Sequence, residues 1–178
     1  MPKISLVAPS TALTADAVVI GVVQGAKGPH LAPGADAVDD ALGGTSLLDA
    51  LEAAGATGKA DEVTMIPTLG LARFPLIVAT GLGPAVDDEA MRRAVGAAVR
   101  ELGGKRTVHV ALDASVRAVA EGAGLGAYSF TEYKSTPPPT RLRTVTIAGA
   151  TDKAGKDDLK HAAAVTDAVT FVRDLVNP

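Results

Sequence analysis

The sequence predicts an α/β fold: a single domain with a largely parallel or mixed sheet and helices on its faces. Short β-branched runs alternate along the chain with longer amphipathic patterns. Several of these runs are apolar on consecutive residues, as is typical of strands covered on both faces. The length of 178 residues suits one domain, and the chain contains no internal repeat and no low-complexity tail.

The predicted strands are runs rich in Val, Ile or Thr that are bounded by Gly, Pro or Asp. They are Ala17–Val23, Glu62–Pro67, Leu76–Thr80, Thr107–Leu112 and Thr144–Ala148, with a weaker candidate at Ile4–Val7. The run Ser135–Thr140 contains three consecutive prolines but is short and precedes a strand. It therefore predicts a loop within the domain rather than a domain boundary.

Apolar residues at helical spacing predict a helix over Asp87–Leu102 and a shorter one around Ser46–Ala54. Three acidic residues open the longer helix, where negative charge is favourable at the positive end of the helix dipole. Gly103-Gly104 follow its last residue and are expected to end it.

A further helix is predicted from about Ala114 to Tyr128, although it contains three glycines, Gly122, Gly124 and Gly126. Each glycine costs a helix roughly 1 kcal/mol relative to alanine. Such costs are reasonable where another element packs very close, so we expect close packing against this helix.

The last predicted helix, Asp157–Asn177, is unusually apolar. One stripe comprises Ala162, Val165, Val169, Val172 and Val176; a second comprises Ala164, Ala168, Phe171 and Leu175. Only a narrow polar strip remains, formed by Lys160, Asp167 and Asp174 with help from Thr170 and Arg173. Either the helix is deeply buried in its own domain, or one stripe faces this domain and the other contacts something outside this chain. Because the chain stops at Pro178 directly after the helix, we expect a longer parent protein.

The composition of the chain excludes several kinds of site and argues against several kinds of partner. The chain has no cysteine, which excludes disulfides, thiolate metal sites and a cysteine nucleophile. Its net charge of −3 argues against strong sequence-independent binding of nucleic acid. The N-terminus lacks the apolar core of a secretory signal, and the longest apolar run near it, Ala17–Val23, is too short to cross a bilayer. The sequence predicts a cytoplasmic protein with no membrane contact.

We predict no catalytic, cofactor-binding or metal-binding residue in this chain. His30, His109 and His161 are predicted in a loop, a strand and the exposed start of a helix, without the spacing of a ligand set. Ser115 and Ser129 have no recognisable histidine partner.

Three other motifs have a functional and an ordinary interpretation. Gly81-Leu-Gly-Pro84 invites a phosphate-binding interpretation, but Val86 stands where a third glycine is needed and acidic residues follow, so a tight turn is expected. The carboxylate pairs Asp39-Asp40 and Asp157-Asp158 are expected to be solvated. Arg92-Arg93 and Lys105-Arg106 could form a basic patch, but the net acidity favours ordinary solvated charges.

Two segments resemble the leucyl (cytosol) aminopeptidase family. Glu121–Phe130, followed by Tyr133-Lys134-Ser135, resembles a helix that ends in the family's Gly-Ala-Tyr-x-Phe-x-x-Tyr-Lys run. The end of the chain, from Ala168 to Asn177, resembles the helix that leads from the N-terminal domain of the family into its peptidase domain. In this chain Gly124 stands before Leu125 where relatives have a bulky residue, and Pro178 follows Asn177 without the usual threonine.

The resemblance implies a macro-domain-like N-terminal domain over residues 1–155 and a connecting helix over 156–178, leading to an absent C-terminal peptidase domain. It implies a hexameric enzyme that releases N-terminal amino acids, preferentially leucine, using two divalent metals (Mn or Zn) held in that absent domain. This chain alone is expected to be inactive and to serve hexamer assembly and access to the active site. Two alternatives stay open: a free-standing macro-like module that binds a ligand of the ADP-ribose type, and a DNA-binding domain.

Overall fold

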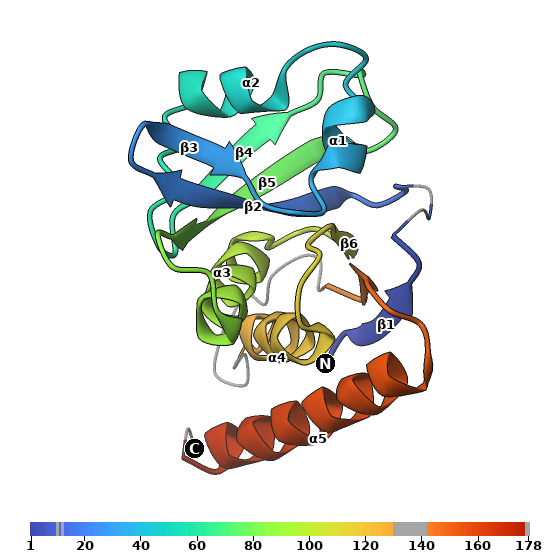
Figure 1. Ribbon diagram of the computed structural model, residues 1–178. Coiled ribbons are helices and arrows are strands. Elements are labelled where there is room, and N and C mark those ends of the chain that lie inside the picture. The colour runs from blue at the N-terminus through green and yellow to red at the C-terminus, as the bar shows by residue number, and fades with distance from the viewer. Residues whose placement is uncertain (10, 12, 130–141, 177–178) are drawn as a thin grey trace.

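The computed structural model describes residues 1–9, 11, 13–129 and 142–176, and shows a sheet enclosed between helices (Figure 1). The strands are β1 (Lys3–Val7), β2 (Ala17–Gly25), β3 (Gly28–Leu31), β4 (Val63–Pro67), β5 (Leu76–Gly83), β6 (Thr107–Val110) and β7 (Thr144–Ala148). The helices are α1 (Asp36–Asp40), α2 (Leu47–Ala53), α3 (Asp88–Glu101), α4 (Val116–Gly126) and α5 (Lys153–Val176).

The sheet is mixed, with the strand order β1-β7-β6-β2-β5-β4 and with β3 paired to β2. The five strands from β1 to β5 in this order are parallel, whereas β4 runs antiparallel to β5 and β3 antiparallel to β2. The register places Thr144 beside both Lys3 of β1 and Thr107 of β6. The first residues of β1, β7 and β6 therefore meet at one end of the sheet.

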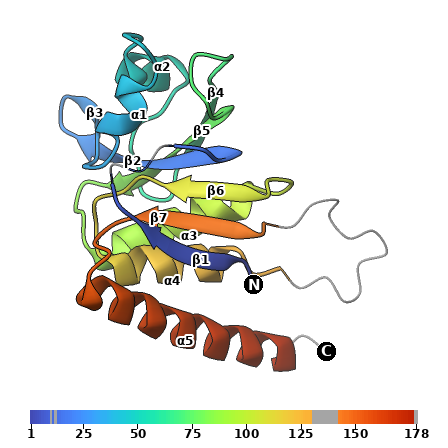
Figure 2. The same ribbon diagram turned by 90° about the vertical axis from the view of Figure 1, so that its right-hand side faces the viewer.

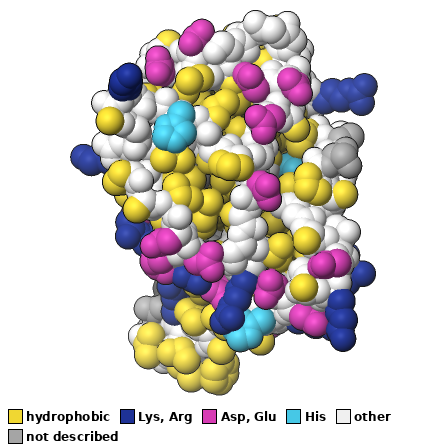
Figure 3. Space-filling model, in the orientation of Figure 1, with side chains coloured by type: hydrophobic (Ala, Val, Ile, Leu, Met, Phe, Trp, Pro, Cys, Tyr) yellow, Lys and Arg dark blue, Asp and Glu magenta, His cyan; other side chains and the backbone are white. Residues whose placement is uncertain are grey.

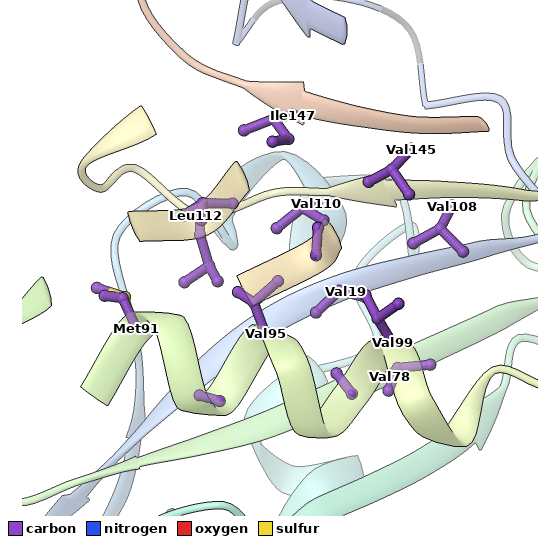
Figure 4. Close-up of a cluster of buried hydrophobic side chains, with 14 of the residues drawn as sticks. Val19, Val78, Met91, Val95, Val99, Val108, Val110, Leu112, Val145 and Ile147 are labelled. Carbon is purple, nitrogen blue, oxygen red and sulfur yellow. The ribbon is translucent and has the colours of Figure 1, made fainter. Parts of the chain in front are cut away.

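Each face of the sheet has its own apolar core, because successive strand residues point to opposite faces. Val19, Val78 and Val108 belong to the cluster that packs on α3 and α4 (Figure 4). Val18 and Ile20 belong to the second cluster, which packs on α1 and α2. This two-sided burial explains why β2 is apolar on consecutive residues.

Helix α5 forms an outer layer beyond α4 and extends along the whole side of the domain (Figure 2). It contacts its own domain mainly through α4: Ala162 is 1% exposed and Thr166 is 2% exposed on the side that faces α4. Most of its other side chains are exposed. The connecting helix is therefore not deeply buried within its own domain.

The predicted α/β class and mixed sheet are confirmed, and all six predicted strands are present with ends close to those expected. Two elements were not predicted, β3 and α1. His30 accordingly lies on strand β3 rather than in a loop. Helix α5 begins at Lys153 rather than Asp157, because the side chain of Asp152 accepts a hydrogen bond from the backbone N–H of Gly155 and caps an earlier turn (2.9 Å). The proline run and the motif residues from Phe130 to Ser135 lie outside the described residues.

Candidate functional site

A cluster of ion pairs around one buried carboxylate joins α3 to α4. Glu121 of α4 is 5% exposed. Its carboxylate accepts hydrogen bonds from Nε of Arg92 on α3 (2.7 Å) and from Nε of Arg117 one turn earlier on α4 (3.1 Å). Arg92 also pairs with Glu89 at the start of α3. Two carboxylates and two guanidinium groups therefore neutralise one another between the two helices.

The titration of this cluster follows from these contacts. Burial works to raise the pKa of Glu121, but the hydrogen bonds and charges of Arg92 and Arg117 outweigh it, so the pKa lies below its ordinary value. The hydrogen bond with Glu121 raises the pKa of Arg92. Glu121 and Arg92 are therefore both charged at neutral pH, and each satisfies the other through their hydrogen bond. The cluster therefore holds α3 and α4 together, and its buried carboxylate is not available as a general acid or base.

His109 is the one buried histidine among the described residues, at 4% exposure on β6. Its Nδ1 lies 2.9 Å from the hydroxyl of Thr146 on β7, and its Nε2 is buried without a partner. Burial lowers the pKa of His109, so the ring is neutral at pH 7. Its prediction as a hydrogen-bonded strand residue in an apolar setting agrees with this position.

A shallow hollow of about 220 Å³ lies where β5 meets the start of α3. Its charged lining consists of Asp61, Asp87, Glu89 and Arg93. Arg93 pairs with Asp61, with Nε at 3.2 Å from the carboxylate, and Asp87 caps α3 by accepting from the N–H of Ala90 (2.8 Å). Three carboxylates against one arginine leave a negative hollow, which disfavours a phosphate ligand.

The glycines beside this hollow have a packing explanation. A Cβ on Gly81 would lie 1.8 Å from the carbonyl oxygen of Lys59, and Gly83 adopts a φ of +75°. The segment that approaches them is also tied to β5, since the N–H of Asp61 donates to the carbonyl of Gly81 (3.0 Å). Close backbone approach therefore accounts for the Gly-Leu-Gly sequence, and a phosphate-binding role for it stays without support.

The remaining candidates are dispersed. Asp39 accepts a hydrogen bond from the N–H of Leu47 (2.8 Å), and Ser115 caps α4. Asp157 and His161 are exposed along α5. No three His, Asp or Glu side chains gather as a metal site within the residues that the structure describes. That the whole chain holds no catalytic or metal-binding residue stays a prediction.

Of the two basic pairs, Arg92-Arg93 is occupied by the ion pairs above, whereas Lys105-Arg106 joins a basic row. Strand register places Arg143 beside Arg106, because the N–H of Arg143 donates to the carbonyl of Arg106 (2.8 Å). Lys3 lies at the same end of the sheet on the next strand, where it is in register with Thr144 and its N–H donates to the carbonyl of Arg143 (2.8 Å). The carboxylate of Asp16 accepts from the N–H groups of Arg106 and Thr107, which lowers its pKa and places one negative charge beside the row.

One further feature is an exposed apolar surface on α5, which we name the outer face. It consists of Ala164, Ala168, Phe171, Val172, Leu175 and Val176. Its four large side chains are between 56% and 68% exposed. Figure 3 shows hydrophobic side chains gathered over the C-terminal end of α5. In the described part of the chain, no helix meets the length and apolarity needed to span a bilayer.

Comparison with known proteins identifies the family of the chain. Residues 19–137 match the model of the cytosol aminopeptidase family, N-terminal domain. The chain is 42% identical over 191 residues to a probable cytosol aminopeptidase of Streptomyces griseus, and the match covers 93% of this chain but 37% of the relative. A probable cytosol aminopeptidase of Micrococcus luteus is 43% identical, with 93% and 35% covered. The chain therefore spans little more than a third of the length of the curated relatives it matches.

Solved structures show the same fold. A mutant of tomato leucine aminopeptidase superimposes with a TM-score of 0.76 over 99% of this chain and 39% of that protein, at 23% identity. The bottromycin maturation enzyme BotP superimposes with a TM-score of 0.66 at 26% identity, over 93% of this chain and 33% of that protein. On the family match and the sequence identity together, this chain belongs to the cytosol aminopeptidase family, of which it comprises the N-terminal domain.

Proposed function

We propose that this chain is the non-catalytic N-terminal domain of a metal-dependent leucyl aminopeptidase, and that it serves assembly of the enzyme and access to its active site. The intact enzyme is proposed to release N-terminal amino acids, preferentially leucine, from peptides in the cytoplasm during intracellular protein turnover. It is proposed to work as a homo-hexamer. The observation that carries the proposal is the family match together with the limited span, 37% of the Streptomyces griseus relative.

We place the metals of the proposed enzyme outside this chain. The described residues contain no cluster of three possible ligands, and the buried carboxylate of Glu121 is already engaged by two arginines. We propose that two divalent metals, Mn or Zn, lie in the C-terminal domain, where they would activate water for attack on the peptide carbonyl. We expect the residues of this domain to contribute no step to that reaction.

The first experiment is to read the coding sequence past codon 178. We expect the frame to continue into a domain with aspartate, glutamate and lysine metal ligands. A stop codon directly after Pro178 would defeat the proposal and favour a free-standing binding module.

A second experiment tests inactivity. The isolated 178-residue chain, supplied with Mn²⁺, is expected to leave leucine p-nitroanilide intact, while the full-length protein hydrolyses it. Turnover that scales with the concentration of the isolated chain and survives repurification would contradict the assignment.

The basic row of Lys3, Arg106 and Arg143 favours one second candidate, binding of a nucleic-acid backbone at the start of β1, β7 and β6. The test is retention of the chain on a DNA column at low salt. Loss of retention in Arg106→Gln/Arg143→Gln, but not in the ion-paired control Arg93→Gln, would support it. Passage of the unaltered chain without retention would exclude it.

A further inference from the structure

The centre of the outer face, formed by Ala164, Ala168, Phe171 and Leu175, lies on the side of α5 away from its own domain, and Val172 and Val176 extend it at the end of the helix. A helix turns by about 100° per residue, so Ala164, Phe171 and Leu175 fall on the side opposite to Ala162 and Thr166, which face α4. The chemical type of the exposed side chains also changes along the helix, from charged to apolar. Its first half exposes Lys156, Lys160 and His161, among others, whereas its last two turns expose Phe171, Val172, Leu175 and Val176.

Polar contacts fix this orientation of the helix. The hydroxyl of Tyr128, at the end of α4, donates to the carboxylate of Asp174 (2.8 Å). The guanidinium of Arg173 stacks over the ring of Tyr128, 5.3 Å from its centroid, and its Nη1 lies 3.5 Å from the carbonyl oxygen of Leu125. Rotating α5 to bury Phe171 against α4 would break these contacts and turn Thr166 and Arg173 away from α4. The domain therefore holds its apolar outer face toward the outside.

We propose that the outer face of α5 is the surface on which the C-terminal peptidase domain of the same polypeptide packs. This inference rests on the proposed function. Large contiguous apolar surfaces on a protein mark interaction sites, and a face without a charged residue at its centre calls for an apolar partner rather than for nucleic acid.

The span of the relatives indicates the occupant. The Streptomyces griseus relative is matched over only 37% of its length, and the matching family description is that of an N-terminal domain. In a relative of that length the polypeptide continues beyond the counterpart of α5, so the next domain starts beside the outer face. Such a tether gives that domain a high effective concentration at this surface, which a separate second copy lacks.

The absence of cysteine from the chain makes a clean test possible. Leu175→Cys on the outer face and Lys160→Cys on the polar strip are made separately, in the 178-residue chain and in the full-length polypeptide read from the gene. The rate of alkylation by N-ethylmaleimide is measured on the peptide that carries each new thiol, so that cysteines elsewhere do not contribute. In the isolated chain at low concentration both thiols are expected to react at similar rates. In the full-length protein Leu175→Cys is expected to react at least tenfold more slowly, and Lys160→Cys at an unchanged rate.

Equal reactivity of Leu175→Cys in the two proteins overturns the inference. The inference is also overturned if the thiol introduced by Leu175→Cys is protected from alkylation in the isolated chain, increasingly so at higher concentration, and is no better protected in the full-length protein. In that case a second copy of the chain covers the face. Hydrolysis of leucine p-nitroanilide by the unaltered full-length protein is measured beside the labelling. An active enzyme in which the thiol introduced by Leu175→Cys reacts freely contradicts the docking surface alone, whereas a full-length protein without the metal-ligand domain contradicts the proposed function itself.

Discussion

Glu121 shows how much a single buried side chain can decide in this domain. It was predicted only as the first residue of a family-like segment, yet it is the acceptor that neutralises Arg92 and Arg117 between α3 and α4. A buried charge is tolerated when it is paired and hydrogen-bonded, and it becomes costly once one partner is removed.

The Glu121→Gln variant is expected to lose about 2 kcal/mol of unfolding free energy, because Arg92 and Arg117 would keep their charges and lose the carboxylate between them. The control is Glu89→Gln, which removes the exposed partner of the same Arg92 and should cost less than about 1 kcal/mol. Urea unfolding at pH 7 measures both. Equal losses in the two variants would show that burial of Glu121 has no special weight.

His109 predicts a dependence of stability on pH. Its pKa in the folded protein is lowered by burial below the ordinary value of 6.5, so folding favours the neutral ring. The contribution of the neutral His109 ring to the free energy of unfolding is therefore fully present above about pH 6.5. It is lost as the pH drops from there toward the folded-state pKa, by at most about 1.4 kcal/mol per pH unit.

The variant His109→Val is expected to flatten the fall in unfolding free energy between pH 7 and pH 5. The matched control is His161→Gln on the exposed side of α5, which should leave the slope unchanged. Urea unfolding at several pH values supplies the comparison. A slope in His109→Val as steep as in the unaltered chain would assign the dependence to other groups.

At the scale of elements, the glycines of α4 allow two helices to approach closely. A Cβ on Gly122 would lie 2.4 Å from the carbonyl oxygen of Arg92, and one on Gly126 would lie 2.4 Å from that of Gly96. A Cβ on Gly124 would lie 2.6 Å from Thr166 of α5. The prediction of close packing against this helix is therefore confirmed, with α3 on one side and α5 on the other.

The Gly122→Ala variant is expected to destabilise the domain by about 1–3 kcal/mol through overpacking against the backbone of α3. Gly96→Ala on the facing helix is the control, since its Cβ would meet the carbonyl of Gly122 at 3.4 Å, an ordinary contact. That change should be neutral or stabilise by up to about 1 kcal/mol through helix propensity. Thermal unfolding of both variants tests the pair, and a stable Gly122→Ala variant would contradict the packing argument.

At the scale of the whole molecule, the outer face should govern how the isolated chain behaves in solution. With four large apolar side chains more than half exposed at one end, the 178-residue chain is expected to self-associate as its concentration rises. Phe171→Ser/Leu175→Ser should shift the sedimentation coefficient to that of a monomer while leaving the thermal midpoint unchanged. A chain that is monomeric at all concentrations would refute this expectation.

The sequence alone determined the fold class and the six predicted strands, because period-2 and period-3.6 apolar patterns are local features of the chain. It indicated the family through the resemblance of Glu121–Phe130 and of Ala168–Asn177. It also showed the two apolar stripes of the last helix, although it left open whether both were buried. It missed β3 and α1, which are short and carry few strand or helix signals of their own.

Only the tertiary structure decided which stripe of α5 faces α4, and which charges pair. Arg92 and Glu121 are 29 positions apart and Tyr128 and Asp174 are 46 apart, so no local pattern could join them. The basic row likewise exists only because strand register brings Lys3, Arg106 and Arg143 to one end of the sheet. Local propensity fixes which elements form, whereas packing of distant elements fixes the orientation of each side chain, and with it the surfaces available to a partner.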